Sequence, residues 1–160
     1  MKKQILNLLV LITIVSACEK DDFCTQNPVT PNLVLRFYDN TDRTTLKEVE
    51  RFSIIAQGNT DSLYTNQTTD SIAIPLNSLT TETIYTLKMN NIDGVTTNNQ
   101  VATFTIQYTT EEEYISRSCG FRVIFNNVSF SSNSSWIQDF TPNTLTTINN
   151  QNAAHVQIFH

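Results

Sequence analysis

The stretch VATFTIQY, residues 101–108, decides the fold class, because its side chains alternate between apolar and polar without a break. A period of two is typical of a β-strand with one face on a core, since successive strand side chains point to opposite faces. The stretch therefore predicts a half-buried strand. Its apolar positions are Ala102, Phe104, Ile106 and Tyr108.

The same alternation recurs in six other stretches, and their apolar positions are predicted core residues. Turn signals at residues 58–59 and 93–94, each containing a glycine, separate some of these stretches. Pro75 has no backbone N–H, so its strand is expected at a sheet edge or a bulge. The predicted core residues are Leu33, Leu35, Phe37, Phe52, Ile54, Ala56, Ile72, Ile74, Leu76, Tyr85, Leu87, Met89, Phe121, Val123, Phe125, Val156 and Ile158.

Many short strands with no convincing helix predict an all-β fold with little or no helix. We expect a single-domain β-sandwich over residues 32–160, of immunoglobulin-like or transthyretin-like topology. The chain has no internal repeat and no low-complexity linker that would indicate a second domain. TTEEEYISRS, residues 109–118, is interpreted as loop or strand, although Thr109 or Thr110 would suit the cap of a helical turn.

The first residues have the pattern of a secretory signal peptide. Lys2 and Lys3 precede an apolar run of about 11 residues, whereas a membrane-spanning helix needs about 20. The run ends in the small residues Ser16 and Ala17, which suit a signal peptidase. We therefore expect residues 1–17 to be removed.

The cysteine that follows the cleavage point predicts a lipid anchor. Val15, Ser16, Ala17 and Cys18 together resemble the bacterial lipobox, in which the cysteine thiol receives a diacylglycerol and the new amine is acylated. Two or more acyl chains, such as palmitate, would hold the protein stably in a membrane. The alternative is an ordinary signal peptide with an incidental cysteine.

Residues 18–31 are expected to form a tether between the lipid and the domain. Position 19 is Glu rather than the Asp that retains some lipoproteins at the inner membrane, so we predict the outer membrane. Lys20, Asp21 and Asp22 resemble the short surface-export signal of Bacteroidota lipoproteins, which would turn the domain outward. The alternative is a solvated charged linker on a domain that faces the periplasm.

Two cysteines remain once Cys18 is assigned to lipid, namely Cys24 and Cys119. Cysteines in an oxidising compartment more often pair than stay free, so we predict a disulfide. Two buried thiols are the alternative. A bridge would also pin the tether to the domain.

The charge of the chain excludes nucleic acid as a partner. The ten Lys and Arg include Lys2 and Lys3, so the mature chain keeps eight of them against fifteen Asp and Glu, a formal charge of −7. Nucleic-acid binding needs clustered basic residues that release counterions, and the sequence has no basic run. Such a charge does not suit anionic lipid either.

No catalytic motif, cofactor fingerprint or metal-ligand spacing is present in the sequence. The two histidines, His155 and His160, would face apart on a strand, so we expect one surface imidazole and one at a frayed end, with no metal pair. The sequence therefore predicts no enzyme, no cofactor and no metal.

Two features have a binding interpretation beside a structural one. Glu111, Glu112 and Glu113 would supply oxygens to calcium, but neighbours on a strand splay apart, which favours a solvated acidic edge. Trp136 follows a polar SSNSS run and would stack on a sugar if exposed, whereas most tryptophans lie in cores.

Five stretches resemble a family of small Bacteroidota lipoproteins of unknown function: CEKDDFC, PNLVLRFYD, DSIAIPL, YISRSCGFRVIF and AHVQIFH. Cys24 and the Ser118-Cys119-Gly120 segment are its most specific part. The resemblance implies an envelope address, supports the disulfide and implies no activity. We expect a non-catalytic binding module for a glycan, peptide or envelope partner, with a structural or accessory subunit of an envelope complex as the alternative and a carboxylate-based hydrolase as a third.

Overall fold

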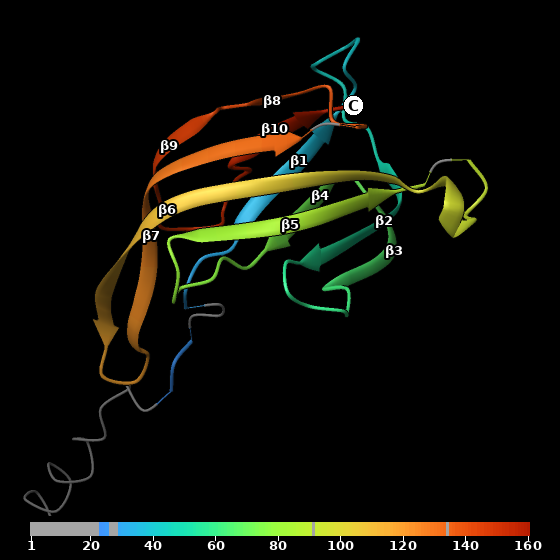
Figure 1. Cartoon of the computed structure of the whole chain (residues 1–160). Helices are drawn as coiled ribbons and strands as arrows, with labels where there is room; N and C mark the ends of the chain where they lie inside the picture. Colours follow the sequence, from blue (N-terminus) through green and yellow to red (C-terminus); the bar gives the residue numbers. More distant parts are fainter. Residues whose placement is uncertain (1–22, 26–28, 91, 134) are drawn as a thin grey trace, which may run out of the picture.

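The computed structural model describes residues 23–25, 29–90, 92–133 and 135–160. Three predictions concern residues outside the described ranges: the signal peptide with its recognition residues Val15, Ser16 and Ala17, the lipid site at Cys18, and the export signal at Lys20, Asp21 and Asp22. The described residues form ten strands in two sheets, and their only helix is a short 3-10 turn, η1 (Thr96–Asn98). The predicted all-β sandwich is confirmed (Figure 1).

The smaller sheet has four strands, in the order β4, β1, β10, β8. The pair β1–β10 is parallel, and the other two pairs are antiparallel. Strand β4 is an edge that ends one residue before Pro75, as expected from the missing N–H of proline. The bounds are β1 (Leu33–Tyr38), β4 (Ser71–Ile74), β8 (Asp139–Thr141) and β10 (Val156–Phe159).

The larger sheet has six strands, in the order β3, β2, β5, β6, β7, β9, and all its pairs are antiparallel. Most of the TTEEEYISRS segment belongs to β6, so its strand interpretation is confirmed. The bounds are β2 (Val49–Ala56), β3 (Tyr64–Thr69), β5 (Glu82–Met89), β6 (Gln100–Ser116), β7 (Gly120–Asn133) and β9 (Thr144–Ile148).

The core between the sheets consists largely of the predicted alternating residues. Phe37, Phe52 and Phe104 are fully buried, and so are most of their predicted neighbours. Burial of a side chain of this size contributes about 1.5–3 kcal/mol, so the strand pattern also carries most of the stability.

The prediction that Phe121 lies in the core is wrong, because its side chain is 65% exposed. Phe121, Val123 and Phe125 do share one face of β7, as expected. However, β6 and β7 run on past the smaller sheet, so this face loses its cover toward the β6–β7 turn (Figure 1). Val123 is therefore only partly buried, and Ala56, the last residue of β2, is also partly buried.

Two bulges reset the alternation inside long strands. Arg51 and Asn127 have φ values of 45° and 52°, each at a shift of register between paired strands. Each shift lets two core side chains lie three residues apart rather than two. The pairs are Val49 with Phe52 and Phe125 with Val128.

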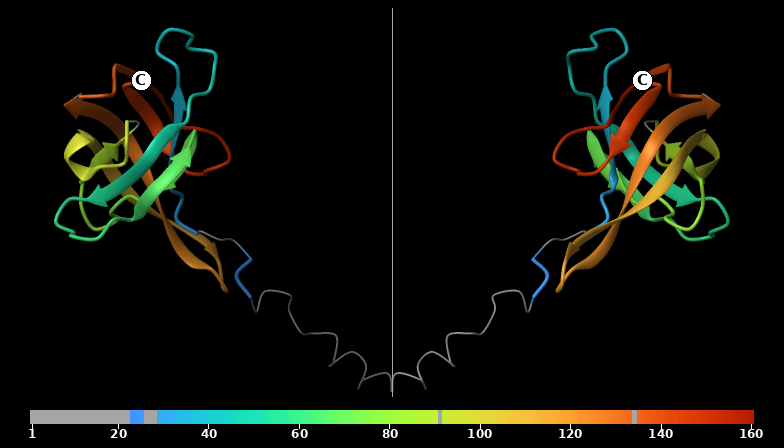
Figure 2. Two further views of the ribbon diagram at one scale, coloured as in Figure 1. Left: turned by 90° about the vertical axis from the view of Figure 1, so that its right-hand side faces the viewer. Right: turned by 90° about the vertical axis from the view of Figure 1, so that its left-hand side faces the viewer.

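The far part of the β6–β7 hairpin, residues 111–124, is called the arm here, and it projects from the body of the sandwich (Figure 2). None of these residues, all of which the structure describes, is buried. A two-stranded ribbon is only marginally stable alone. The arm gains support from the Cys24–Cys119 disulfide, which confirms the predicted pairing, and from the Val123 N–H, which donates to Thr30 Oγ1 at 3.1 Å.

Candidate functional site

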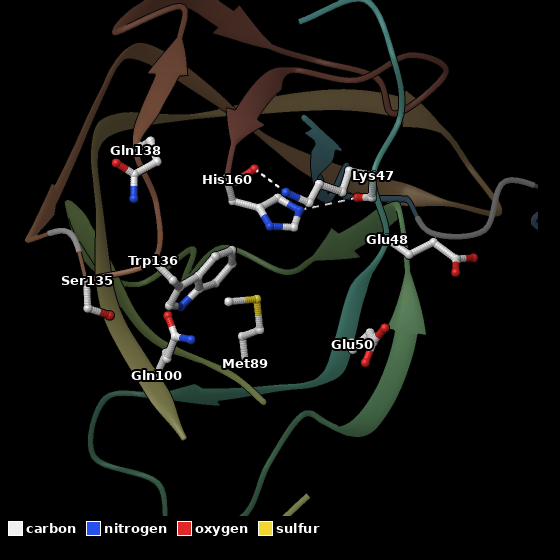
Figure 3. Close-up of a pocket in the computed structure, with 9 residues that line it drawn as sticks. All are labelled: Lys47, Glu48, Glu50, Met89, Gln100, Ser135, Trp136, Gln138 and His160. Carbon is white, nitrogen blue, oxygen red and sulfur yellow. Dashed lines mark hydrogen bonds between the residues drawn. The ribbon is translucent and has the colours of Figure 1, made fainter. Parts of the chain in front are cut away.

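A hollow of about 260 Å³ opens at the end of the sandwich opposite the arm, and we call it the end hollow (Figure 3). It forms where the segment that leads into β2, the last residue of β5, the first residue of β6 and the β7–β8 connection meet the residue after β10. Its lining residues are Lys47, Glu48, Glu50, Met89, Gln100, Ser135, Trp136, Gln138 and His160.

The floor of the end hollow is apolar. Met89 is 5% exposed and Trp136 is 3% exposed. The Trp136 indole donates from Nε1 to the Leu87 carbonyl at 3.2 Å, and its ring meets the edge of Phe52 at 5.9 Å between centroids. Trp136 is thus a core residue, and its ring offers no open face on which a sugar could stack.

His160 forms one wall and is held on several sides. Its ring lies edge-on to Trp136 at 5.6 Å and to Phe37 at 6.1 Å between centroids. Lys47 donates from Nζ to the His160 carbonyl at 2.8 Å and pairs with Asp39 at 3.2 Å. Burial lowers the pKa of the imidazole, so the ring favours its neutral form. The expected frayed end is therefore an ordered part of the site.

The rim supplies polar groups of mixed character. Gln138, Ser135, Glu48 and Glu50 are exposed, and Gln100 is half-buried. Figure 3 shows Glu48 extending away from His160 and Trp136. The two carboxylates and the imidazole therefore do not converge on one point. The amides supply both donors and acceptors, which suits a small neutral polar group above an apolar floor.

His155 lies elsewhere and has a structural task. The imidazole Nδ1 of His155 accepts from the backbone N–H of Val34 at 2.9 Å, and the backbone N–H of His155 donates to the Val34 carbonyl at 2.8 Å. The imidazole thereby stands in for a carbonyl and extends the β1–β10 ladder by one step. Its Nε2 lies 2.9 Å from the Asn150 carbonyl, and burial lowers its pKa. The alternation had indicated only a surface position.

The glutamates of the arm do not gather into a site. Glu113 pairs with Arg122 at 2.6 Å, and Glu111 accepts from the Asn126 amide at 2.8 Å. Glu112 points to the opposite face, as strand geometry requires. Within the part of the chain that the structure describes, no three His, Cys, Asp or Glu side chains gather where they could hold a metal ion.

The end hollow and the tip of the arm are separated by the length of β6. Gln100, on the rim, begins this strand, and Ser116, beside the β6–β7 turn, ends it. A strand rises 3.2–3.4 Å per residue, so 16 steps give a path of about 50 Å along β6. One strand therefore joins the stapled tip to the site at the other end.

Comparison with known proteins places the chain in a family. Residues 51–160, more than half of the chain, match a family described as a family of unknown function (DUF6452). The chain belongs to this family. The DUF6452 match begins inside β2 and includes Trp136, His160 and Cys119, while Lys47 and Cys24 lie before it. No curated protein and no solved structure matches the chain.

Membership in DUF6452 confirms the expectation of an uncharacterised family and assigns no activity. The function must therefore be argued from the end hollow, the arm and the sequence before them. Among the described residues, no helix has the length and apolar character needed to cross a membrane.

Proposed function

We propose that this DUF6452 chain is a lipid-anchored, non-catalytic binding module of the outer membrane, which presents its end hollow to the aqueous space. The observation that carries the proposal is that the disulfide-linked tip of the arm and the end hollow lie at opposite ends of the molecule. The Cys24–Cys119 bridge ties the tip of the arm to the segment that begins at Cys18, and β6 leads from that tip to the rim at Gln100.

The lipid anchor supports the location. Val15, Ser16 and Ala17 precede Cys18 in the order that the lipobox requires, and the acidic tether starts at once after it. Acyl chains on Cys18 would hold the chain in a bilayer, at about 0.8 kcal/mol per buried methylene. The disulfide supports the same location, because disulfides persist in oxidising compartments.

The chemistry of the end hollow supports binding rather than catalysis. The rim sets the Gln100 and Gln138 amides above the apolar floor of Met89 and Trp136. Such a set suits the hydroxyl and amide groups of an envelope glycan or peptide. A glycosidase would need two carboxyls facing each other across a cleft, and Glu48 turns away from the end hollow.

Binding by the end hollow is tested with the lipidated protein in detergent, passed over immobilised envelope polysaccharides and peptidoglycan fragments. We expect the native chain to retain one of these ligands and Gln138→Arg, which fills the end hollow, to lose it. Gln57→Arg, at an exposed position just after β2 and at the end of that strand away from Glu50, is the matched control and should bind as the native chain does. A ligand held equally by both variants contradicts the assignment of the site. A protein recovered with the native chain and with both variants favours the accessory-subunit alternative.

The anchor and its orientation are tested on cells. Labelling with an alkyne palmitate should mark the native protein and not Cys18→Ser, and label that persists in this variant would contradict the anchor. Protease treatment of intact cells should remove the domain if Lys20, Asp21 and Asp22 act as an export signal. Protection of the domain in intact cells, with digestion after the outer membrane is opened, would place it on the periplasmic face.

A further inference from the structure

We propose that the tip of the arm rests in the headgroup region of the membrane that holds the acyl chains of Cys18, with Phe23, Tyr114 and Phe121 as its contacts. This inference rests on the proposed lipid anchor and adds a second point of attachment. The partner is the bilayer surface itself, rather than another protein.

Three exposed aromatic side chains cluster around the stapled tip. Phe23 is 83% exposed, Phe121 is 65% exposed and Tyr114 is 59% exposed. Tyr114 and Phe121 face each other across β6 and β7, with ring centroids 5.4 Å apart. Phe23 precedes Cys24, whose partner Cys119 lies two residues before Phe121. Aromatic residues are favoured at the boundary between hydrocarbon and water, where an apolar body meets polar groups.

The covalent chain keeps this cluster close to the anchor. Cys24 is six steps along the chain from Cys18, and an extended chain spans at most 3.3–3.6 Å per residue, which gives about 20 Å. The disulfide extends this limit from Cys24 to the tip of the arm at Cys119. The polar headgroup layers add only about 5–8 Å to each side of the hydrocarbon core. The tip is therefore confined to the neighbourhood of the membrane surface, whereas the rest of the sandwich is not.

The charges along the arm agree with this placement. Between Tyr114 and Phe121 the only formally charged residue is Arg117, and the carboxylates begin at Glu113, on the side toward the sandwich. Glu113 is paired with Arg122 at 2.6 Å. The tip thus offers aromatic rings to the headgroups, while the acidic residues of β6 stay farther back on the arm.

Contact at the tip would fix how the domain is oriented on the membrane. Acyl chains on Cys18 would attach the domain to the bilayer at one point only. A second contact at the tip would align β6 away from the bilayer and hold the end hollow at the far end of this strand. The arm would then act as a spacer for the binding site.

The test places a fluorescent reporter at the tip. Trp136 is the only tryptophan and lies in the core, so Phe121→Trp adds one reporter whose emission is obtained by difference. The lipidated variant is reconstituted in vesicles of phosphatidylcholine and phosphatidylethanolamine, with some acyl chains brominated near the headgroup. We expect the added emission to shift to shorter wavelength and to be quenched, while the Trp136 emission stays unchanged.

Val95→Trp is the matched control, because Val95 is 51% exposed and lies in the β5–β6 connection at the other end of β6 (Figure 1). Its emission should not be quenched. Vesicle flotation separates the two proposals: a chain that floats with an unquenched tip reporter overturns the membrane contact and leaves the anchor standing. A chain that does not float overturns the anchor itself. Equal quenching of both reporters also overturns the inference, because it would mean that the domain lies flat.

Discussion

Cys24 and Cys119 join the segment in front of the sandwich to the tip of its longest hairpin, across 95 residues of sequence. The bridge closes a loop that contains six of the ten strands. It therefore acts both on the stability of the whole domain and on the position of the arm relative to the tether.

Removal of the disulfide should destabilise the domain. The chain-entropy account gives about 4 to 5 kcal/mol for a loop of this length, so we expect the free energy of unfolding to fall by about 3 to 5 kcal/mol in Cys119→Ser. Urea unfolding followed by Trp136 fluorescence measures the change. The native protein with reductant should behave as the variant does, and the double variant Cys24→Ser/Cys119→Ser should ignore reductant. Equal midpoints for all forms would show that the bridge adds no stability.

The bulge at Asn127 should tolerate glycine and resist a β-branched residue. Its φ of 52° lies in the left-handed region, which costs an ordinary side chain roughly 1–2 kcal/mol. We expect Asn127→Val to lower the free energy of unfolding by about that amount and Asn127→Gly to stay within about 0.5 kcal/mol of the native value. Comparable loss in both variants would point instead to the Asn127 amide, which lies 3.4 Å from Thr109 Oγ1.

The alternation of side chains predicted most of the fold, because each strand buries one face independently of its neighbours. The alternation in residues 101–108 and 33–37 correctly predicts which side chains face the core. The prediction for Phe121 failed for a physical reason. Alternation reports which face a residue occupies, while burial also needs an opposing sheet, and the arm runs on past it.

The candidate site was largely hidden from the sequence. The end hollow is built from connections that share no motif, such as Lys47 before β2 and Gln138 before β8. His160 becomes part of it only because β10 pairs in parallel with β1, a long-range pairing that no local pattern specifies. The disulfide was predictable, because a limited number of cysteines in one compartment leaves few pairings.

The domain should lose stability as pH falls below about 6.5, because burial lowers the pKa of both His155 and His160. The unfolded chain then binds protons at a higher pH than the folded chain does. The histidine contribution is complete above the unfolded pKa and is lost as pH falls through it toward the folded pKa. The Asp42 and Thr41 N–H groups lower the pKa of Asp39 to about 2, so its contribution starts to fall only when the pH drops below the ordinary aspartate pKa of 3.8.

Protonation of His155 at Nδ1 would also set two N–H groups against each other, since that atom accepts from Val34. The substitution His155→Asn keeps an acceptor near the Nδ1 position and removes the titration. Urea midpoints between pH 5 and pH 8 should therefore vary less in His155→Asn than in the native chain. An identical pH profile for the two would assign the effect to His160 alone.

Tyr108 and Thr83 form a buried polar contact at the base of the arm, and the tyrosine hydroxyl also donates to the Asn77 carbonyl at 2.7 Å. Thr83 Oγ1 in turn accepts from the Asn77 N–H at 2.9 Å, so one hydroxyl completes a small network. Tyr108→Phe removes two hydrogen bonds, those to Thr83 Oγ1 and to the Asn77 carbonyl, and we expect it to cost about 1–3 kcal/mol in urea unfolding. Tyr114→Phe, on the same strand but exposed, is the matched control and should change stability by less than about 0.5 kcal/mol. Burial is the property that separates the two positions. Equal losses of stability in the two variants would therefore contradict a contribution from the buried hydrogen bonds of Tyr108.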